Sequence, residues 1–231
     1  WVCTLPMRAA QPTARCACAR RGFLVAEIYE VEEGFDHAFF AGTSCAFGEF
    51  DGVHAGHRYL LAQACETAGR SSGKSIALTF DIDPDEAFHP DRLKKLMTNG
   101  ERLAMLASTG VDAVAVLPFT PAFAALSPEA FLEATFDGTA PAYLHVGCDF
   151  RFGARAAGTV GELEAWGAGA GCAVAAHDLK SADGAPVTAT RIRLLLAEGD
   201  IAEANRLLER PYFMPGTVEP GRGEGADPGF R

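Results

Sequence analysis

The chain has 231 residues, a formal net charge of −10 at pH 7 and 48% hydrophobic residues. This content is sufficient for a buried core, and no apolar run approaches the ~20 residues of a membrane span. The acidic balance argues against a general nucleic-acid surface, which would be basic. An anionic substrate would therefore need a local group of arginines. The candidates are Arg151, Arg155, Arg191 and Arg193.

The cysteines indicate a reducing compartment, so we expect a cytoplasmic protein. There are seven of them, an odd number, and no CxxC is present, which argues against both a disulfide framework and a zinc knuckle. Cys45 and Cys148 fall at predicted strand ends and are expected to be small buried residues.

Residues 1–22 differ from the rest of the chain. They mix prolines, arginines and cysteines without a sustained apolar stretch, whereas a secretory signal needs an apolar region of about 7–15 residues. We expect a poorly ordered N-terminal extension here, followed by one domain over residues 23–210.

The next segment contains the most informative element of the chain. An apolar run over 39–47 predicts a buried strand, and helical spacing of apolar residues predicts a helix over 56–70. Between them the sequence reads G-E-F-D-G-V-H-A-G-H, from Gly48 to His57. The free N–H groups and dipole at a helix start favour anions, and glycines such as Gly52 and Gly56 allow close approach. We interpret this element as a phosphate turn carrying two imidazoles, His54 and His57.

Two other interpretations of this pair stay open. A histidine at a helix start is often a surface or capping residue, and two histidines three apart can form half a metal site. No cysteine or carboxylate stands nearby at ligand spacing, and Asp51 is better suited to the turn. We therefore favour phosphate chemistry and expect no protein-bound metal cluster.

Further strands and helices alternate along the chain. Strands are predicted at 75–81, 112–117, 142–147 and 172–178, and helices at 99–109, 128–136, 159–169, from near 188, and at 200–208. Thr98 and Glu101 have the spacing of a capping box, and Ser127-Pro128 places a cap before a proline at the first helical position. The alternation predicts an α/β fold, a Rossmann-like parallel sheet with helices on both faces, whose ligands bind at the carboxyl ends of the strands.

Of two later motifs, one follows the end of a predicted strand and the other stands at the start of a predicted helix. The run Gly147–Gly153, G-C-D-F-R-F-G, offers a carboxylate, phenyl rings that can stack on a planar heterocycle, and a guanidinium for a phosphate. Taken alone, this run is better interpreted as a β-turn with two core phenylalanines. Thr188–Arg193, T-A-T-R-I-R, opens a helix with hydroxyls and arginines and suits a phosphate, or is an ordinary cap with solvated arginines.

Together these motifs resemble the adenylyltransferase module of bacterial bifunctional riboflavin kinase/FAD synthetases. The resemblance covers about residues 40 to 217 and includes T-F-D at 79–81, F-T-P-A-F at 119–123, G-C-D-F-R-F-G, T-R-I-R and R-P-Y at 210–212. The H-A-G-H element alone implies only the nucleotidyltransferase superfamily, whereas D-F-R-F-G with F-T-P-A-F is specific to the flavin branch.

The resemblance implies transfer of AMP from ATP to FMN, with the FMN phosphate attacking the α-phosphorus in line. His54, His57 and Arg191 would be catalytic. Mg²⁺ would be bound chiefly through the ATP phosphates, and no nucleic-acid or membrane partner is implied. The ATP-binding residues implied are Gly48, Phe50, Asp51, Gly56, Thr188, Thr190 and Arg193. The flavin-nucleotide residues implied are Asp149, Phe150, Arg151 and Asp81.

Three positions depart from the family pattern. Glu49 stands where the family usually has asparagine, Asp83 where it has histidine, and Ala189 where it has serine. Residues 211–231 resemble the start of the riboflavin kinase barrel, without the motif that binds ATP for that reaction, so no kinase activity is expected. The alternatives are a degenerate paralogue that binds flavin or ATP without turnover, and a nucleotidyltransferase for another small phosphorylated acceptor.

Overall fold

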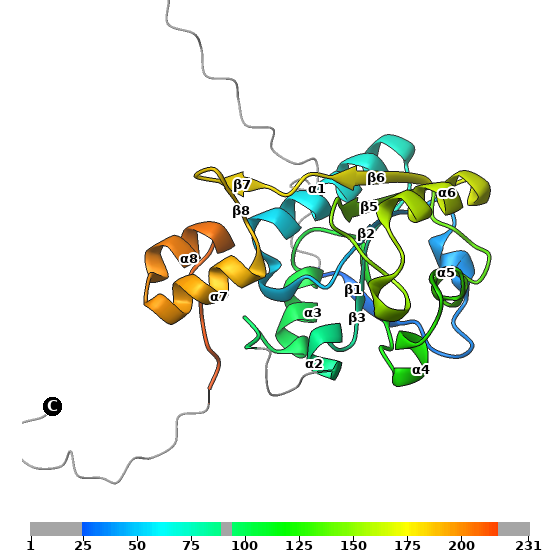
Figure 1. Cartoon of the computed structure of the whole chain (residues 1–231). Coiled ribbons are helices and arrows are strands. Elements are labelled where there is room, and N and C mark those ends of the chain that lie inside the picture. Colours follow the sequence, from blue (N-terminus) through cyan, green and yellow to red (C-terminus); the bar gives the residue numbers. More distant parts are fainter. Residues whose placement is uncertain (1–24, 89–93, 217–231) are drawn as a thin grey trace, which may run out of the picture.

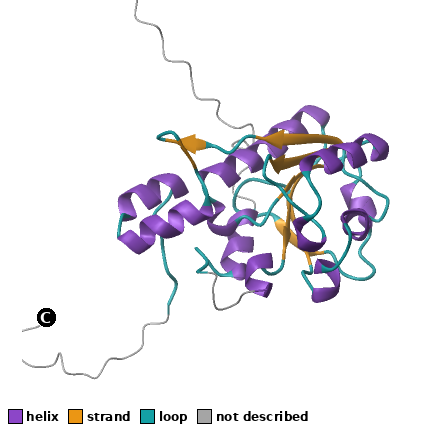
Figure 2. Ribbon diagram, in the orientation of Figure 1, coloured by secondary structure: helices purple, strands orange, loops and turns teal. Residues whose placement is uncertain are grey.

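The computed structural model describes residues 25–88 and 94–216. Six parallel strands form one sheet in the order β1-β4-β3-β2-β5-β6, with helices on both faces (Figures 1 and 2). This is the Rossmann-like α/β architecture that the sequence predicts. The predicted extension at 1–22 and most of the barrel-like segment at 211–231 lie outside the described residues.

Most predicted elements are confirmed to within two residues. The strands are β2 (Ser44–Phe47), β3 (Ser75–Phe80), β4 (Ala113–Leu117), β5 (Tyr143–Gly147) and β6 (Ala173–His177). The helices are α1 (Ala55–Ser71), α3 (Asn99–Ala107), α5 (Pro128–Phe136), α6 (Val160–Ala170), α7 (Ala189–Glu198) and α8 (Ile201–Leu208). The Thr98–Glu101 capping box and the Ser127 cap are both present.

Several short elements were not predicted. These are β1 (Glu27–Glu30), α2 (Pro84–Phe88), α4 (Pro121–Ala124), η4 (Ala154–Ala156) and the hairpin of β7 (Ser181–Ala182) and β8 (Ala185–Pro186). The predicted strand 39–47 was too long, because His37–Phe40 form the short helix η2. The Asp36 side chain caps η2, and Phe40 is buried against Phe136 of α5. Cys148 was also predicted wrongly. It is exposed, because it lies one residue beyond the end of β5.

The two faces of the sheet carry separate apolar cores. On one face α1 and α3 pack over the central strands through residues such as Leu61 and Leu106. On the other, α5 and α6 contribute Phe131, Phe136 and Leu163. Because both faces are covered, the inner strands are almost entirely buried, as expected of a parallel sheet.

The order of the strands defines where a ligand can bind. The chain leaves β2 toward β3 and β4 on one side and later returns to the other side of β2 with β5 and β6. The loops after β2 and β5 therefore flank the topological switch point at the carboxyl edge of the sheet, where doubly wound folds bind ligands. The turn with the two histidines follows β2, and the D-F-R-F-G loop follows β5.

Helices α7 and α8 form a separate pair beside the N-terminal end of α1 (Figure 1). Their small core includes Ile192, Leu207 and Leu208 and takes in Ala55 of α1 and Leu96 from the segment before α3. The pair therefore brings the T-A-T-R-I-R motif next to the turn after β2. Within the described ranges no helix is long and apolar enough to cross a membrane.

Candidate active site

The turn after β2 is tightly folded and largely buried. It contains the short helix η3 (Asp51–Val53), with Phe50 at φ +60° and Gly52 at φ +75°. A Cβ at Gly52 would lie 2.5 Å from Leu96 Cδ1, so only glycine fits this position without displacing its neighbours. The Phe50 ring is buried and meets the His57 ring edge to face. Gly48, at the start of the turn, donates its N–H to the Leu78 carbonyl of β3.

His54 and His57 come together at the N-terminus of α1. His54 is the N-cap, with its Nδ1 accepting from the His57 N–H at 3.4 Å, and the two rings stack with centroids 3.6 Å apart. Gly56 allows this packing, since a Cβ there would lie 3.1 Å from His54 Cε1. The remaining N–H groups of the first turn and the helix dipole make this end suited to an anion.

Both imidazoles are neutral at pH 7. Burial, with a contribution from Arg193, lowers the pKa of His54 to about 4. Burial, followed by the proximity of His54 and Arg102, lowers the pKa of His57 well below its ordinary value. A neutral imidazole donates one hydrogen bond, so each ring can act as a donor to an oxygen without adding a full charge.

Asp51 holds three parts of the site together. Its carboxylate is buried, accepts the Leu96 N–H at 3.1 Å and pairs with the Arg193 guanidinium at 2.6 Å. Arg210 donates to the Gly52 carbonyl at 2.8 Å. The turn is thereby tied both to the segment before α3 and to the α7–α8 pair.

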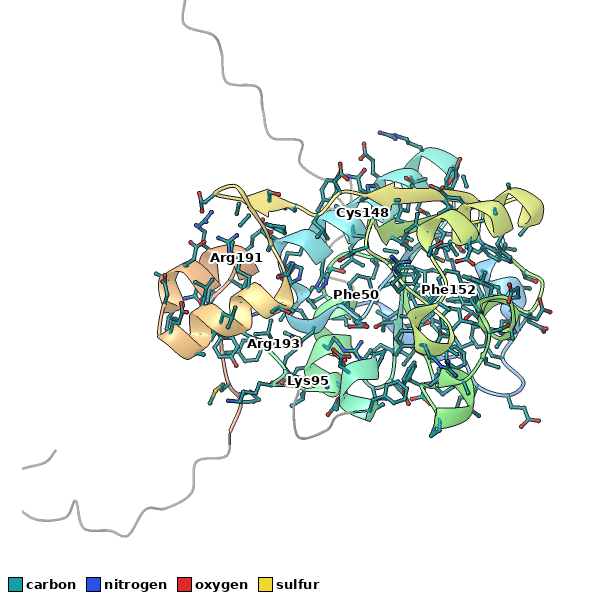
Figure 3. All side chains as sticks on the ribbon, in the orientation of Figure 1. Phe50, Lys95, Cys148, Phe152, Arg191 and Arg193 are labelled. Atoms are coloured by element: carbon teal, nitrogen blue, oxygen red, sulfur yellow. The ribbon has the colours of Figure 1, made fainter. Side chains whose placement is uncertain are left out.

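Arg191 and Arg193 point in different directions from α7 (Figure 3). Arg193 faces Asp51 in the turn. The Arg191 guanidinium instead donates to the carbonyls of Ala182 and Ala185 in the hairpin at 3.0 and 3.1 Å, and pairs with Glu203 of α8 at 3.1 Å. Thr188 caps α7 through the Arg191 N–H at 3.1 Å, and Thr190 is exposed on the first turn.

The loop after β5 presents its polar side chains to solvent. Asp149 and Arg151 are exposed, while the Phe150 ring packs against Phe47 with centroids 5.1 Å apart. Phe152 is buried and joins Gly158 in a small β-bridge. The polar groups are therefore accessible while the backbone between them is anchored.

Phenylalanines from other loops lie near the carboxyl end of β3. Phe119 contacts Phe80, the last residue of β3, at 5.2 Å between centroids, and Phe88 contacts Phe119 at 5.9 Å. Phe88 is 60% exposed. Asp81 fixes this arrangement, because its carboxylate accepts the Phe119 N–H at 2.8 Å and the Ile82 N–H at 2.7 Å. Asp81 is thus engaged in holding two loops.

The acidic positions Glu49 and Asp83 adjoin the turn. Glu49 keeps exposed surface, but neighbouring protein groups still desolvate its carboxyl. This desolvation, followed by the charge of Asp83, raises the pKa of Glu49 to about 7. Asp83 is buried, which raises its pKa, while its carboxylate accepts the Asp85 N–H at 2.9 Å. Among described residues no three histidine, cysteine or acidic side chains form a group that could hold a metal ion.

Arg102 is a residue that sequence reasoning missed. It is 1% exposed and comes from α3 on the helix face that also carries the buried Leu106. Its guanidinium donates to the Glu49 carbonyl in the turn and to the Phe80 carbonyl at the end of β3. The sequence offers one signal that could have identified it: Arg102 stands four residues before Leu106, on the apolar face of the predicted helix.

The fold and this site define a doubly wound α/β protein with a helix N-terminus suited to an anion at its topological switch point. The chain belongs to the FAD synthetase family, whose family model matches residues 36–191. It is 33% identical over 187 residues to the bifunctional riboflavin kinase/FMN adenylyltransferase of Listeria monocytogenes, covering 80% of this chain and 59% of that protein. A protein with the same name from Pseudomonas fluorescens is 34% identical over 178 residues, covering 77% and 57%.

The chain thus spans less than three fifths of the length of these two relatives. Among solved structures, a Streptococcus pneumoniae protein titled macrolide-efflux protein has a TM-score of 0.69 and 24% identity, covering 81% of this chain and 63% of that one. This likeness concerns the fold alone.

Proposed function

We propose that this protein transfers the AMP group of ATP to FMN, giving FAD and pyrophosphate. The observation that carries the proposal is the pairing of two loops at one sheet edge in a chain of the FAD synthetase family. One loop offers a helix N-terminus with two neutral imidazoles, and the other offers exposed polar groups beside phenylalanine rings.

The ATP side would be the turn after β2. The free N–H groups at the start of α1 would bind phosphate oxygens, and His54 and His57 would donate to the α-phosphate as charge develops on it. Because His54 Nδ1 accepts from a backbone N–H, its proton is on Nε2 and is available for donation. Gly48, Phe50, Asp51 and Gly56 would shape the turn, and catalysis would consist of positioning and charge stabilisation.

The departing pyrophosphate would be met from α7. Arg193 and Arg191 are both ion-paired, but only Arg193 lies against the turn, through Asp51. We therefore assign to Arg193 the charge nearest the phosphates, with Thr188 and Thr190 at the helix start. Arg191 was expected from the resemblance to be catalytic. Its hydrogen bonds to hairpin carbonyls and to Glu203 favour a supporting role, in which it holds the hairpin against α7.

The flavin side would be the loop after β5. Phe150 would contact the isoalloxazine, Arg151 the FMN phosphate, and Asp149 a ring or ribose donor. Asp81 would act indirectly by fixing Phe119.

Mg²⁺ would arrive on the ATP phosphates, since it retains waters and needs few protein ligands.

The direct test is to incubate the chain with FMN, ATP and Mg²⁺ and to measure FAD and pyrophosphate. We expect both products in equal amounts. A parallel incubation with riboflavin in place of FMN measures the kinase reaction separately, through the appearance of FMN. FMN binding without FAD would favour a degenerate binding protein, and absence of FMN binding would favour another phosphorylated acceptor. The cysteine usage favours a cytoplasmic location.

A further inference from the structure

Arg102 connects the proposed ATP turn to the end of the neighbouring strand. One guanidinium nitrogen, Nη1, donates to the Glu49 carbonyl at 3.0 Å and to Thr79 Oγ1 at 2.6 Å. The other, Nη2, donates to the Phe80 carbonyl at 2.6 Å and to the Asp81 carbonyl at 3.3 Å. The planar fork of arginine thereby fixes two chain segments that are about thirty residues apart.

The contact with Glu49 orients a peptide group of the turn. A peptide unit is planar, and its C=O and N–H point in opposite directions. Because the Glu49 carbonyl is turned toward Arg102, the Phe50 N–H is directed away from α3. A rigid turn of this kind avoids the cost of ordering the backbone when an anion binds.

The burial of Arg102 makes these contacts strong. Arg102 is 1% exposed, so its guanidinium has lost its water. Both Nη atoms have acceptors within the protein, whereas Nε has none among the described residues. The direct partners of the guanidinium are carbonyl and hydroxyl oxygens and the Asn99 amide oxygen at 3.3 Å. Desolvation lowers the pKa of Arg102, while Asp83, Asp51 and Glu49 oppose this effect through their charge.

We propose that Arg102 is a positioning residue for ATP: its guanidinium holds the Glu49–Phe50 peptide in the orientation that the triphosphate requires. This inference rests on the proposed binding of ATP at the turn. It assigns to Arg102 no contact with the substrate, and it predicts a larger effect on MgATP than on FMN, whose side Arg102 meets only through the carbonyls of Phe80 and Asp81.

The test compares Arg102→Met and Arg102→Lys with the unmodified chain, with MgATP binding measured by calorimetry in the absence of FMN. Loss of a hydrogen bond from a charged donor corresponds to about tenfold or more in affinity, so Arg102→Met should raise the Kd for MgATP about tenfold. Arg102→Lys, which keeps the charge but not the fork, should restore affinity only in part. The Kd for FMN should rise by a smaller factor than the Kd for MgATP.

Leu106→Ala serves as the matched control, because Leu106 is fully buried on the same helix and its side chain has no group that could hydrogen-bond to the turn. It should lower the melting temperature with little change in MgATP affinity. If Arg102→Met does not fold, Thr79→Val is the second variant, since it removes the hydroxyl at 2.6 Å from Nη1 and should weaken MgATP binding about threefold.

Unchanged MgATP affinity in a folded Arg102→Met protein would overturn the inference, as would full recovery with lysine, which would show that only the charge matters. The calorimetric readout also separates this inference from the proposed function. A chain that binds MgATP but makes no FAD would contradict the proposed reaction and leave the positioning of the turn by Arg102 intact. A chain that does not bind MgATP would contradict both.

Discussion

The loop after β2 and the loop after β5 lie on either side of the same switch point but differ in how they are held. In the first, Asp51, the Glu49 carbonyl and the Gly52 carbonyl are each fixed by an arginine from another element. In the second, Asp149 and Arg151 are exposed, and the anchors are aromatic packing and backbone hydrogen bonds. A preorganised turn and a loop with accessible polar groups should respond differently to mutation and to ligand.

This difference suits the two proposed substrates. A triphosphate presents many charges and gains most from donors that are already in place. A flavin presents a large planar ring that binds through area and stacking, which tolerate small adjustments of side chains. We therefore expect sharp losses from changes in the turn and graded losses from changes in the loop.

The largest effect should follow from His57→Ala. Removal of one donor to the developing charge costs about 10²–10³ in turnover in comparable sites, and the fold should survive because α1 is anchored by Leu60, Leu61 and Ala64. FAD formation under saturating substrates is the measurement, and His37→Ala, at the far end of the sheet, is the control. Equal activity in His57→Ala would exclude the proposed role of the imidazole.

The next effect should come from Gly52→Ala. This substitution combines φ +75° with a Cβ only 2.5 Å from Leu96 Cδ1, so we expect a loss of about 1–3 kcal/mol in the free energy of unfolding and weaker MgATP binding. Thermal and denaturant unfolding test this directly. Gly100→Ala is the control, because a Cβ there meets nothing within 4 Å. Equal stability of both variants would show that the turn is less constrained than its packing indicates.

A smaller effect is expected from Phe150→Ala in the second loop. Loss of an aromatic contact worth about 0.5–1.5 kcal/mol should raise the Kd for FMN about twofold to tenfold while MgATP affinity is retained. FMN fluorescence quenching provides the measurement. Phe35→Ala removes a partly buried ring from the aromatic cluster around η2 and should leave FMN affinity unchanged. A comparable loss of MgATP affinity in Phe150→Ala would contradict the separation of the two sides.

The smallest effect concerns Glu49 and depends on pH. Its folded-state pKa is raised to about 7, so the carboxyl is largely neutral at pH 6 and ionised at pH 8, where it repels the triphosphate. Glu49→Gln should therefore improve MgATP affinity at pH 8 by about twofold to fivefold, because charge effects at an exposed site are modest, and have little effect at pH 6. Glu133→Gln, exposed on α5, is the control. An improvement of the same size at both pH values would show that the charge of Glu49 is not the cause.

Much of the framework was predictable because it depends on short-range physics. Apolar runs located β2 to β6, and cap residues such as Thr98 and Ser127 located the helix starts. Short elements such as β1 and the β7–β8 hairpin were missed, because two to four residues with exposed side chains carry too little periodicity. The length of β2 was overestimated because Phe39 and Phe40 belong to a short helical turn. Their apolar side chains do not distinguish such a turn from a strand.

The sequence by itself determined that a glycine-rich turn with two histidines joins a buried strand to a helix, and that D-F-R-F-G follows another strand at the same edge. Only the tertiary structure decided which arginines serve the turn. Arg193 reaches Asp51 across 142 positions of the chain, Arg191 turns to the hairpin, and Arg102 lies buried beneath Glu49. The local spacing of apolar and polar residues determines which backbone element forms. The long arginine side chain, in contrast, binds acceptors that distant segments bring close and that water does not reach.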